Sequence, residues 1–285
     1  MTTSNSGAPK SGPLMTAYVE VNDNSIANAG RYVLAKDGSN VFDIALVFAA
    51  NINHDDQKGT YLGFNPHVQD VLDNAGKLIK PLRDKGIRVL LSVLGNHQGV
   101  GFANFPDQPS AAAFADQLAA AVTRYGLDGI DFDDEYADYP TSGEGQTNTW
   151  SFPYLVDALR TKLGKAKTIS LYFIGPSSRT LTYGDIDVGR LIDYSWNAGY
   201  GSFDPPDVPG LGKARLAAAA IDIQDEEAGG WSTAADLAKQ TLDQGYGVYN
   251  TYRLPDTDVS TGLSAVTKVL YNSDVRPPGT TEPAP

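Results

Sequence analysis

Residues 87–135 read IRVLLSVLGNHQGVGFANFPDQPSAAAFADQLAAAVTRYGLDGIDFDDE, and this stretch indicates the fold most directly. The apolar runs at 87–95 and 127–135 predict two strands, and the periodic pattern at 109–126 predicts a helix between them. The first strand is apolar on both faces, as is typical of parallel strands covered on both sides. The stretch therefore predicts a strand–helix–strand unit of an α/β fold.

The same alternation continues in both directions along the chain. We expect eight strands, at 16–21, 42–52, 87–95, 127–135, 168–175, 192–197, 218–224 and 247–252. Helical patterns lie at 65–86, 109–126, 152–164, 232–245 and 261–271. The segments 176–191 and 198–217 are rich in Gly, Pro and Ser, which predicts shortened helices after strands five and six. Eight strands over one core favour a single (β/α)8 TIM barrel over a doubly wound sheet.

The two ends of the chain differ in composition from the region between them. Residues 1–13 and 273–285 contain too few apolar side chains to offset the entropy lost on ordering, so we expect tails there. The second is rich in Pro and Thr and could also be a linker. One domain is predicted over 14–272. The first residues lack the apolar core of a signal peptide.

The composition excludes several classes of function. The chain of 285 residues carries 22 Lys and Arg against 34 Asp and Glu, a formal net charge of −12. This charge repels phosphate backbones and anionic lipids, so neither nucleic acid nor a membrane is expected as a partner. The absence of Cys excludes disulfides and thiolate chemistry. Nothing in the sequence demands more than a monomer.

The chemistry is concentrated in the fourth predicted strand. Because alternate residues of a strand face opposite sides, Asp131, Asp133 and Glu135 share one face, and Ile130 and Phe132 share the other. The apolar face suits the helix-covered outside of a barrel, so the acids point to its axis, with Glu135 nearest the C-terminal rim where barrel active sites lie. Crowded buried carboxyl groups have raised pKa values and titrate together. A protonated Glu135 could therefore act as a general acid.

Two other interpretations of this acidic run are weaker. A calcium-binding EF-hand loop needs Gly where Tyr136 stands and Glu where Ser142 stands. A solvated acidic turn would not need apolar residues at strand period. The 3 His are far apart in sequence, so no metal site is expected, and no cofactor is predicted.

The run DGIDFDDE at 128–135 fits the D-x-x-D-x-D-x-E signature of glycoside hydrolase family 18. The segments LDGIDFDDEYADY, AYVEVNDNS, FAANIN, LLSVLGNHQGVGFANFP and GYGVY resemble the single-domain bacterial endo-β-N-acetylglucosaminidases of that family. The similarity extends over about residues 16–272. It implies a (β/α)8 barrel, in agreement with the strand count, and a secreted bacterial enzyme.

The resemblance also implies a reaction. The substrate would be the β-1,4 bond of the di-N-acetylchitobiose core of N-glycans, of the high-mannose type. Glu135 would protonate the glycosidic oxygen while the 2-acetamido carbonyl oxygen of the sugar attacks the anomeric carbon, which retains configuration. Asp133 would orient the acetamido N–H, and Asp131 would share a proton with Asp133. Asp128 is expected to be structural and to form hydrogen bonds at the start of the strand. Asp134 is expected to face outward.

Further residues at the strand ends are predicted to contact the glycan. The resemblance suggests Tyr252 as an aromatic floor and Asn197 as the polar residue near the acetamido group, although packing alone would also explain Tyr252. The full set is Phe48, Asn96, His97, Tyr172, Trp196, Asn197, Tyr200 and Tyr252.

Two departures from the family pattern bear on the sugar accepted. Relatives carry Tyr where this chain has Gly199, so either Tyr200 substitutes for it or that contact is missing. Relatives of the endo-acting type carry Asn where this chain has Phe173. Three alternatives therefore remain: a chitinase acting on chitin oligomers, a hydrolase of another polysaccharide, and a glycan-binding lectin on the same fold.

Overall fold

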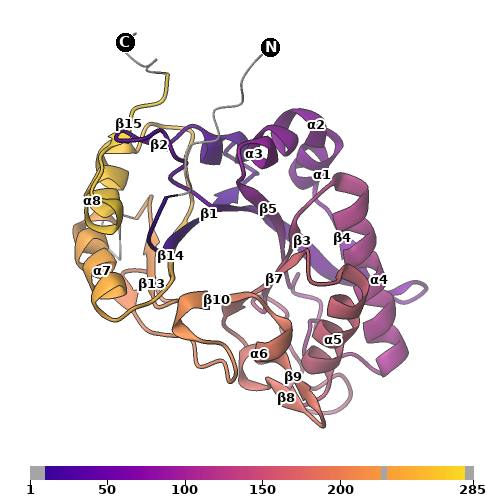
Figure 1. Cartoon of the computed structure of the whole chain (residues 1–285). Coiled ribbons are helices and arrows are strands. Elements are labelled where there is room, and N and C mark those ends of the chain that lie inside the picture. The colour runs from indigo at the N-terminus through magenta and orange to yellow at the C-terminus, as the bar shows by residue number, and fades with distance from the viewer. Residues whose placement is uncertain (1–9, 226–229, 280–285) are drawn as a thin grey trace.

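The protein forms a β-barrel with helices around its outside (Figure 1). This computed structural model describes residues 10–225 and 230–279. The barrel strands follow one another in the order β13, β14, β1, β3, β5, β6, β7 and β10. Their bounds are Leu14–Glu20 (β1), Ile44–Asp55 (β3), Arg88–Leu94 (β5), Gly129–Asp133 (β6), Thr168–Phe173 (β7), Tyr194–Asn197 (β10), Ala219–Asp222 (β13) and Val248–Tyr252 (β14).

The barrel closes between β10 and β13 through a short strand. β12 (Leu216–Ala217) pairs in parallel with β10, and β13, which starts two residues later, pairs in parallel with β14. Each barrel strand overlaps one of the predicted strands, and all of these pairings around the ring are parallel. The prediction of a (β/α)8 barrel is therefore confirmed.

The outer layer is made of helices of very unequal length. The longer ones are α1 (Pro66–Asp73), α4 (Gln108–Tyr125), α5 (Ser151–Leu163), α7 (Trp231–Asp243) and α8 (Ser260–Tyr271). After the fifth and sixth barrel strands, β7 and β10, only short ones occur in the described chain, as predicted. These are the 3-10 helix η2 (Ser177–Arg179), α6 (Val188–Leu191) and the 3-10 helix η3 (Lys213–Arg215).

The helix predicted over 65–86 is divided into three pieces. α1 ends at Asp73, and α2 (Ala75–Leu78) and α3 (Lys80–Asp84) follow it. Proline has no backbone N–H and disfavours helical backbone in the residue before it, so Pro81 can only lie in the first turn of a new helix. The prediction of one continuous helix was wrong because apolar periodicity continued across this break.

α4 illustrates how the sequence sets the ends of a helix. The side chain of Asp107 accepts a hydrogen bond from the Ser110 N–H at one end, and Gly126 closes the other end with a φ of 65°. The apolar face of the helix buries Phe114 and Leu118 in the layer outside the barrel. Burial of a side chain such as Phe114 contributes about 1.5–3 kcal/mol.

Short strands extend the structure beyond the barrel. β4 (Gly59–Gly63) forms a hairpin with the end of β3, β8 (Thr182–Tyr183) pairs with β9 (Ile186–Asp187), and β11 (Ser202–Phe203) pairs with β13. The 3-10 helix η1 (Ile26–Gly30) precedes β2 (Val33–Leu34), which pairs with β15 (Val275–Arg276).

The pairing of β15 with β2 corrects one predicted boundary. Ser273 and Val275 are buried, so the chain remains packed past residue 272, where a tail was predicted to begin. At the other end, Lys10 forms an ion pair with Asp43. The composition could not indicate these long-range contacts. Residues 1–9 and 280–285 of the predicted tails lie outside the described residues.

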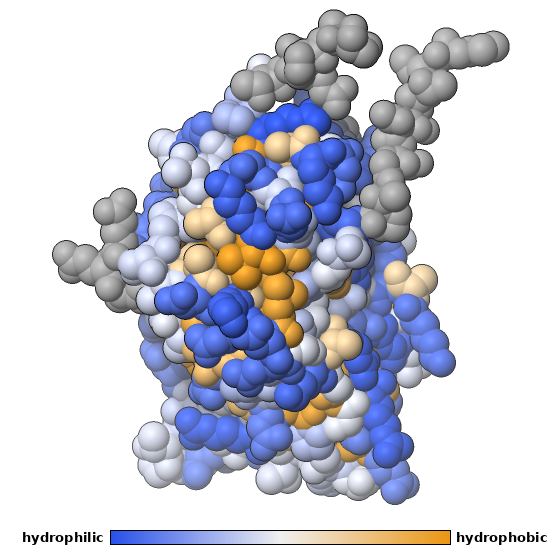
Figure 2. Space-filling view, turned by 60° about the vertical axis from the view of Figure 1, so that its left-hand side comes forward, coloured by the Kyte–Doolittle hydropathy of each residue, from blue (hydrophilic) through white to orange (hydrophobic). Residues whose placement is uncertain are grey.

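The side of the barrel that carries α7 and α8 is mostly hydrophilic, with an apolar patch at its centre (Figure 2). In the described part of the chain, no helix combines the length and the apolar character that crossing a bilayer requires.

Candidate active site

β6 separates apolar from acidic side chains as the alternation predicts. Ile130 and Phe132 are fully buried in the layer under the helices, and the Phe132 ring lies 5.1 Å from the Phe102 ring, centroid to centroid. Asp131 and Asp133 point to the other side, into the barrel. At the entry of the strand, the Asp128 carboxylate accepts hydrogen bonds from the Val89 N–H and the Arg83 guanidinium, the holding role that we expected.

Asp131 lies deepest in the acidic row, and its carboxylate accepts hydrogen bonds from three hydroxyl groups. The Tyr18 hydroxyl and the Ser92 hydroxyl donate to its Oδ2 at 2.7 and 2.9 Å, and the Ser170 hydroxyl donates to its Oδ1 at 2.6 Å. Burial raises the pKa of Asp131 to about 6, although these hydrogen bonds oppose the rise. The group can therefore exchange a proton near neutral pH.

Asp133 is buried but lacks a complete set of partners. No described residue donates a hydrogen bond to its Oδ1. Burial holds the pKa of Asp133 well above its ordinary value, and the charges of Glu135 and Asp131 act in the same direction. A buried oxygen without a donor is costly unless a ligand supplies one. Asp133 is thus prepared either to keep a proton or to accept an N–H from a bound molecule.

Glu135 lies outermost and is half-buried. Its backbone carbonyl accepts a hydrogen bond of 2.9 Å from the Gly95 N–H, which continues the pairing of β5 and β6 beyond the strands. Burial raises the pKa of the Glu135 carboxyl. The protonated form of this group therefore persists to higher pH than in an exposed glutamate, which suits a proton donor.

Asp134 faces away from the barrel interior, as predicted, and anchors the acidic row. Its carboxylate accepts hydrogen bonds from the Tyr139 hydroxyl and from the Ser177 N–H, the latter at 2.7 Å. Gly175 lets the loop after β7 approach closely, because a Cβ there would lie 2.0 Å from the Asp134 carbonyl oxygen. These contacts hold the end of β6 in place next to Glu135.

A cavity of about 360 Å³ opens above the acidic row. Its walls are largely aromatic, and the Tyr200 and Tyr252 rings stack at 5.0 Å between centroids. The Tyr172 hydroxyl donates to the Tyr200 hydroxyl at 2.8 Å, and the Tyr252 hydroxyl donates to Glu20 at 2.9 Å. The lining residues are Tyr18, Glu20, Phe48, Leu94, Asp133, Glu135, Tyr136, Tyr172, Ala198, Tyr200 and Tyr252.

Four of the predicted binding residues meet at this cavity: Phe48, Tyr172, Tyr200 and Tyr252. The ring of Tyr200 therefore reaches the wall even though Gly199 precedes it. Phe173 packs against the layer outside the barrel, so its substitution for Asn does not alter the cavity wall.

The other four predicted binding residues do not line the cavity, and of these only His97 lies against a lining residue, Tyr136. Trp196 is fully buried and donates its indole N–H to the hydroxyl of the cavity residue Tyr18 at 2.7 Å, so it supports the cavity wall without lining it. The Asn197 amide is occupied by its own loop and by the Ala218 carbonyl. Asn96 donates to Asn53. These amides have backbone or side-chain partners that sequence spacing does not reveal.

Three functional candidates were not predicted from the sequence: Tyr18, Glu20 and Tyr136. Tyr18 and Glu20 alternate on β1 and share its inner face, so the same period of two that identified the acids could have indicated them. Tyr136 follows the strand, where periodicity no longer applies.

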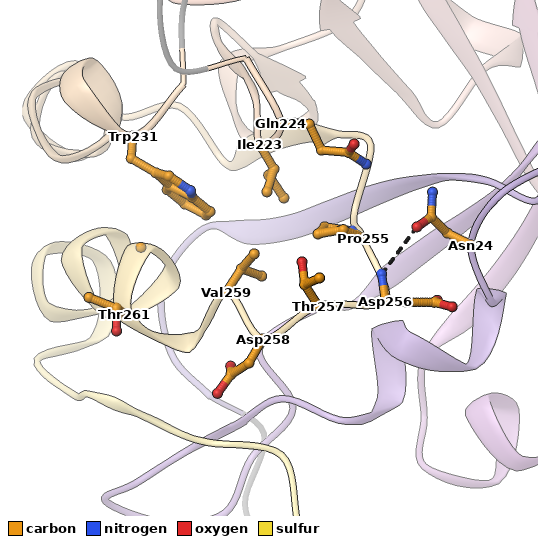
Figure 3. Close-up of a pocket in the computed structure, with 11 residues that line it drawn as sticks. Asn24, Ile223, Gln224, Trp231, Pro255, Asp256, Thr257, Asp258, Val259 and Thr261 are labelled. Carbon is orange, nitrogen blue, oxygen red and sulfur yellow. Dashed lines mark hydrogen bonds between the residues drawn. The ribbon is translucent and has the colours of Figure 1, made fainter.

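A second, larger cavity of about 660 Å³ lies on the same rim, outside the loop that follows β14. Figure 3 shows the Trp231 ring, Ile223 and Val259 facing this space, and the Asp256 N–H donating to Asn24. None of the β6 carboxyl groups lines it. Among residues 10–225 and 230–279, no group of three or more His, Asp or Glu side chains is arranged to hold a metal ion.

Comparison with known proteins identifies the family. The model of "Glycosyl hydrolases family 18" matches residues 16–205, which include the whole acidic row. The chain belongs to glycosyl hydrolase family 18. It is 52% identical over 262 residues to "Endo-beta-N-acetylglucosaminidase" of Flavobacterium sp. (strain SK1022), covering 92% of this chain and 82% of that protein. It is 31% identical over 281 residues to "Endo-beta-N-acetylglucosaminidase F1" of Elizabethkingia meningoseptica, covering 94% and 81%.

Solved structures of this family agree with the barrel described above. EndoBT-3987 of Bacteroides thetaiotamicron with a Man5GlcNAc product has a TM-score of 0.82 and 29% identity. The match covers 94% of this chain, and the chain spans 62% of the length of EndoBT-3987. The complex of EndoBT-3987 with a Man9GlcNAc2Asn substrate has a TM-score of 0.79 and 27% identity. The chain is therefore a family 18 glycoside hydrolase with the TIM-barrel fold of that family.

Proposed function

We propose that this protein is an endo-β-N-acetylglucosaminidase that cleaves the β-1,4 bond of the di-N-acetylchitobiose core of high-mannose N-glycans. The observation that carries the proposal is the row Asp131, Asp133 and Glu135, which rises along β6 into an aromatic cavity. The relative with 52% identity bears this activity in its name. EndoBT-3987 was solved with a high-mannose glycan substrate and product.

In the first half of the proposed reaction, Glu135 is the acid. It transfers its proton to the glycosidic oxygen as the bond from that oxygen to the anomeric carbon breaks. The carbonyl oxygen of the sugar's own 2-acetamido group bonds to the anomeric carbon from the opposite face and forms an oxazolinium ion. The raised pKa of Glu135, caused by burial, keeps this proton available.

Asp133 acts on the acetamido group. Its unpartnered Oδ1 accepts the acetamido N–H, and its negative charge offsets the positive charge that develops on the oxazolinium ring. The proton that Asp133 holds at rest passes toward Asp131, whose pKa near 6 makes it a suitable recipient.

In the second half, Glu135 is the base. Its carboxylate takes a proton from water as the water oxygen attacks the anomeric carbon, and the oxazolinium ring opens. Two inversions leave the configuration at the anomeric carbon retained. Aromatic walls provided by Tyr172, Tyr200 and Tyr252 contact the C–H faces of the sugar.

The proposal extends to the setting of the enzyme. We propose one catalytic domain that works as a bacterial monomer. We also propose that it is secreted, because N-glycans are carried on the surface of secreted proteins. A net charge of −12 fits a neutral sugar substrate better than a nucleic acid.

The experiment compares the wild-type protein with Glu135→Gln on a high-mannose glycopeptide, chitin oligomers and a mannan-type polysaccharide, with products read by mass spectrometry. The wild type should leave one GlcNAc on the peptide. Glu135→Gln should lower kcat by about 10²–10⁴-fold, because general acid catalysis is lost, while glycan binding in a pull-down persists. Cleavage of only chitin oligomers or mannan, or binding without cleavage, would show that the proposal is wrong.

A further inference from the structure

The residue directly after the proposed acid is an aromatic side chain held at the open edge of the cavity. Tyr136 lines the cavity and is 53% exposed. The two other large hydrophobic side chains that are exposed, within the described chain, are Tyr183 and Leu242, and neither lines this cavity. An aromatic ring left in solvent at the edge of a binding cavity is accessible to a sugar bound there.

Tyr136 is held against the loop that follows β5. The His97 N–H donates to the Tyr136 carbonyl at 2.6 Å, and the two rings lie 5.4 Å apart between centroids. On its other side, the His97 ring nitrogen Nδ1 lies 2.9 Å from Asp138. The close approach of the two loops requires Gly95, because a Cβ there would lie 2.4 Å from the Ala137 N–H nitrogen.

The backbone of this cluster is strained. His97, Tyr136 and Asp138 have φ values of 54°, 55° and 53°, in the left-handed region that residues other than glycine rarely adopt. Such conformations persist only where the surroundings hold them, and they gather at ligand-binding sites. Packing of the core does not explain the strain, since the side chains of His97 and Asp138 are largely exposed.

Tyr136 and His97 lie on the side of the cavity opposite the stacked rings of Tyr200 and Tyr252. The stacked rings of Tyr200 and Tyr252 come from β10 and β14, which lie on either side of β13 in the closed ring. β13 lies opposite β5, the strand that precedes the loop with His97. Glu135 therefore lies between an enclosed aromatic wall and the exposed pair Tyr136 and His97. The sugar whose acetamido group reaches Asp133 occupies the enclosed part. The sugar that leaves is attached to a protein and must project into solvent.

We propose that Tyr136, held in place by His97, forms the binding surface for the N-acetylhexosamine on the leaving side of the scissile bond. Tyr136 contacts the sugar ring through its aromatic face. His97 is a positioning residue, which Asp138 orients and which holds Tyr136 beside Glu135. This inference rests on the proposed function and names the subsite that takes the protein-linked sugar.

The test uses a high-mannose glycan oxazoline as a donor, because this molecule is already activated and has no leaving sugar. Tyr136→Ala should slow hydrolysis of the oxazoline less than it weakens transfer to an acceptor, because no leaving sugar takes part in that hydrolysis. Its transfer of the glycan to an added GlcNAc acceptor should need an acceptor concentration about tenfold higher, since one aromatic contact is lost. Tyr136→Phe should behave like the wild type. Tyr183→Ala, which removes an exposed tyrosine of β8, is the matched control and should change neither reaction.

A double-mutant cycle tests the role of His97. His97→Ala should weaken acceptor use in the same direction as Tyr136→Ala, and it should add nothing when Tyr136 is already Ala. Additive effects would contradict the positioning role.

The outcomes separate this inference from the proposed function. If the wild type cleaves glycopeptide but Tyr136→Ala uses the acceptor normally, or if it loses oxazoline hydrolysis to the same extent as transfer, the inference is wrong. If the wild type neither cleaves high-mannose glycopeptide nor consumes the oxazoline, the proposed function itself is wrong.

Discussion

The two cavities on the C-terminal rim differ in both size and chemistry. The cavity above β6 has a volume of about 360 Å³ and contains Asp133 and Glu135, whose pKa values are raised by burial. The cavity beside Trp231 is larger, about 660 Å³, and its carboxyl groups, Asp256 and Asp258, are exposed. Size alone would select the cavity that lacks buried carboxyl groups. What distinguishes a site for acid–base chemistry is a set of carboxyl groups that cannot all ionise in the space they share.

After the loss expected for Glu135→Gln, the largest effect is expected at Asp133. Asp133→Asn should lower kcat on a high-mannose glycopeptide by about 10²–10³-fold, because the charge that offsets the oxazolinium ion is removed. Steady-state kinetics checks this. Asp256→Asn makes the same change in the larger cavity and should leave kcat unaltered. Equal losses in the two variants would contradict the distinction between the cavities.

The next effect is on stability and concerns Asp131. Its pKa is raised by burial from 3.8 to about 6, so the folded state holds a proton that the unfolded state releases. The stabilisation is complete below pH 4 and is lost as the pH rises through about 6, on the order of 3 kcal/mol in the free energy of unfolding.

Urea unfolding of the wild type and Asp131→Asn between pH 4 and 7 measures this. The wild type should lose stability relative to the variant across that window. Parallel curves would mean that Asp131 is not proton-linked to folding and that the acidic row does not differ from exposed carboxyl groups in this respect.

A smaller effect is expected where the acidic row is anchored. Tyr139→Phe removes the hydroxyl that donates to Asp134, which should cost about 1–3 kcal/mol because a buried charged acceptor loses a partner. Thermal unfolding would show a lower Tm, and kcat should fall less than in Asp133→Asn. An unchanged Tm would show that the Ser177 N–H holds Asp134 without help.

The smallest effect is expected in the larger cavity. Trp231→Ala should leave kcat on a glycopeptide within about twofold of the wild type, as for changes away from a reacting centre. If kcat instead fell tenfold or more, the larger cavity would also contribute to catalysis. The distinction between a catalytic and a non-catalytic cavity would then be wrong.

Local patterns predicted much of this molecule. The eight barrel strands were predicted from short apolar runs, and the separation of Asp131 and Asp133 from Ile130 and Phe132 from a period of two. Both patterns depend only on neighbouring residues. The short helices after β7 and β10 followed from composition. The break at Pro81 was also local, but apolar periodicity concealed it.

Long-range contacts decided the rest. Tyr18, Tyr172, Tyr200 and Tyr252 come together only because the barrel closes and brings β1, β7, β10 and β14 to one rim. Their spacing along the chain does not predict that these four tyrosines lie together.

The sequence by itself therefore determined the barrel and the direction of its acids, because strand geometry sets where consecutive side chains point. Only the tertiary structure decided which partners each side chain found. In the folded chain, the Asn197 amide bonds to its own loop and Trp196 is buried behind Tyr18. One carboxylate oxygen of Asp133 is left without a partner among the described residues. Hydrogen bonds and burial depend on residues that are distant in sequence, and those neighbours exist only once the ring is closed.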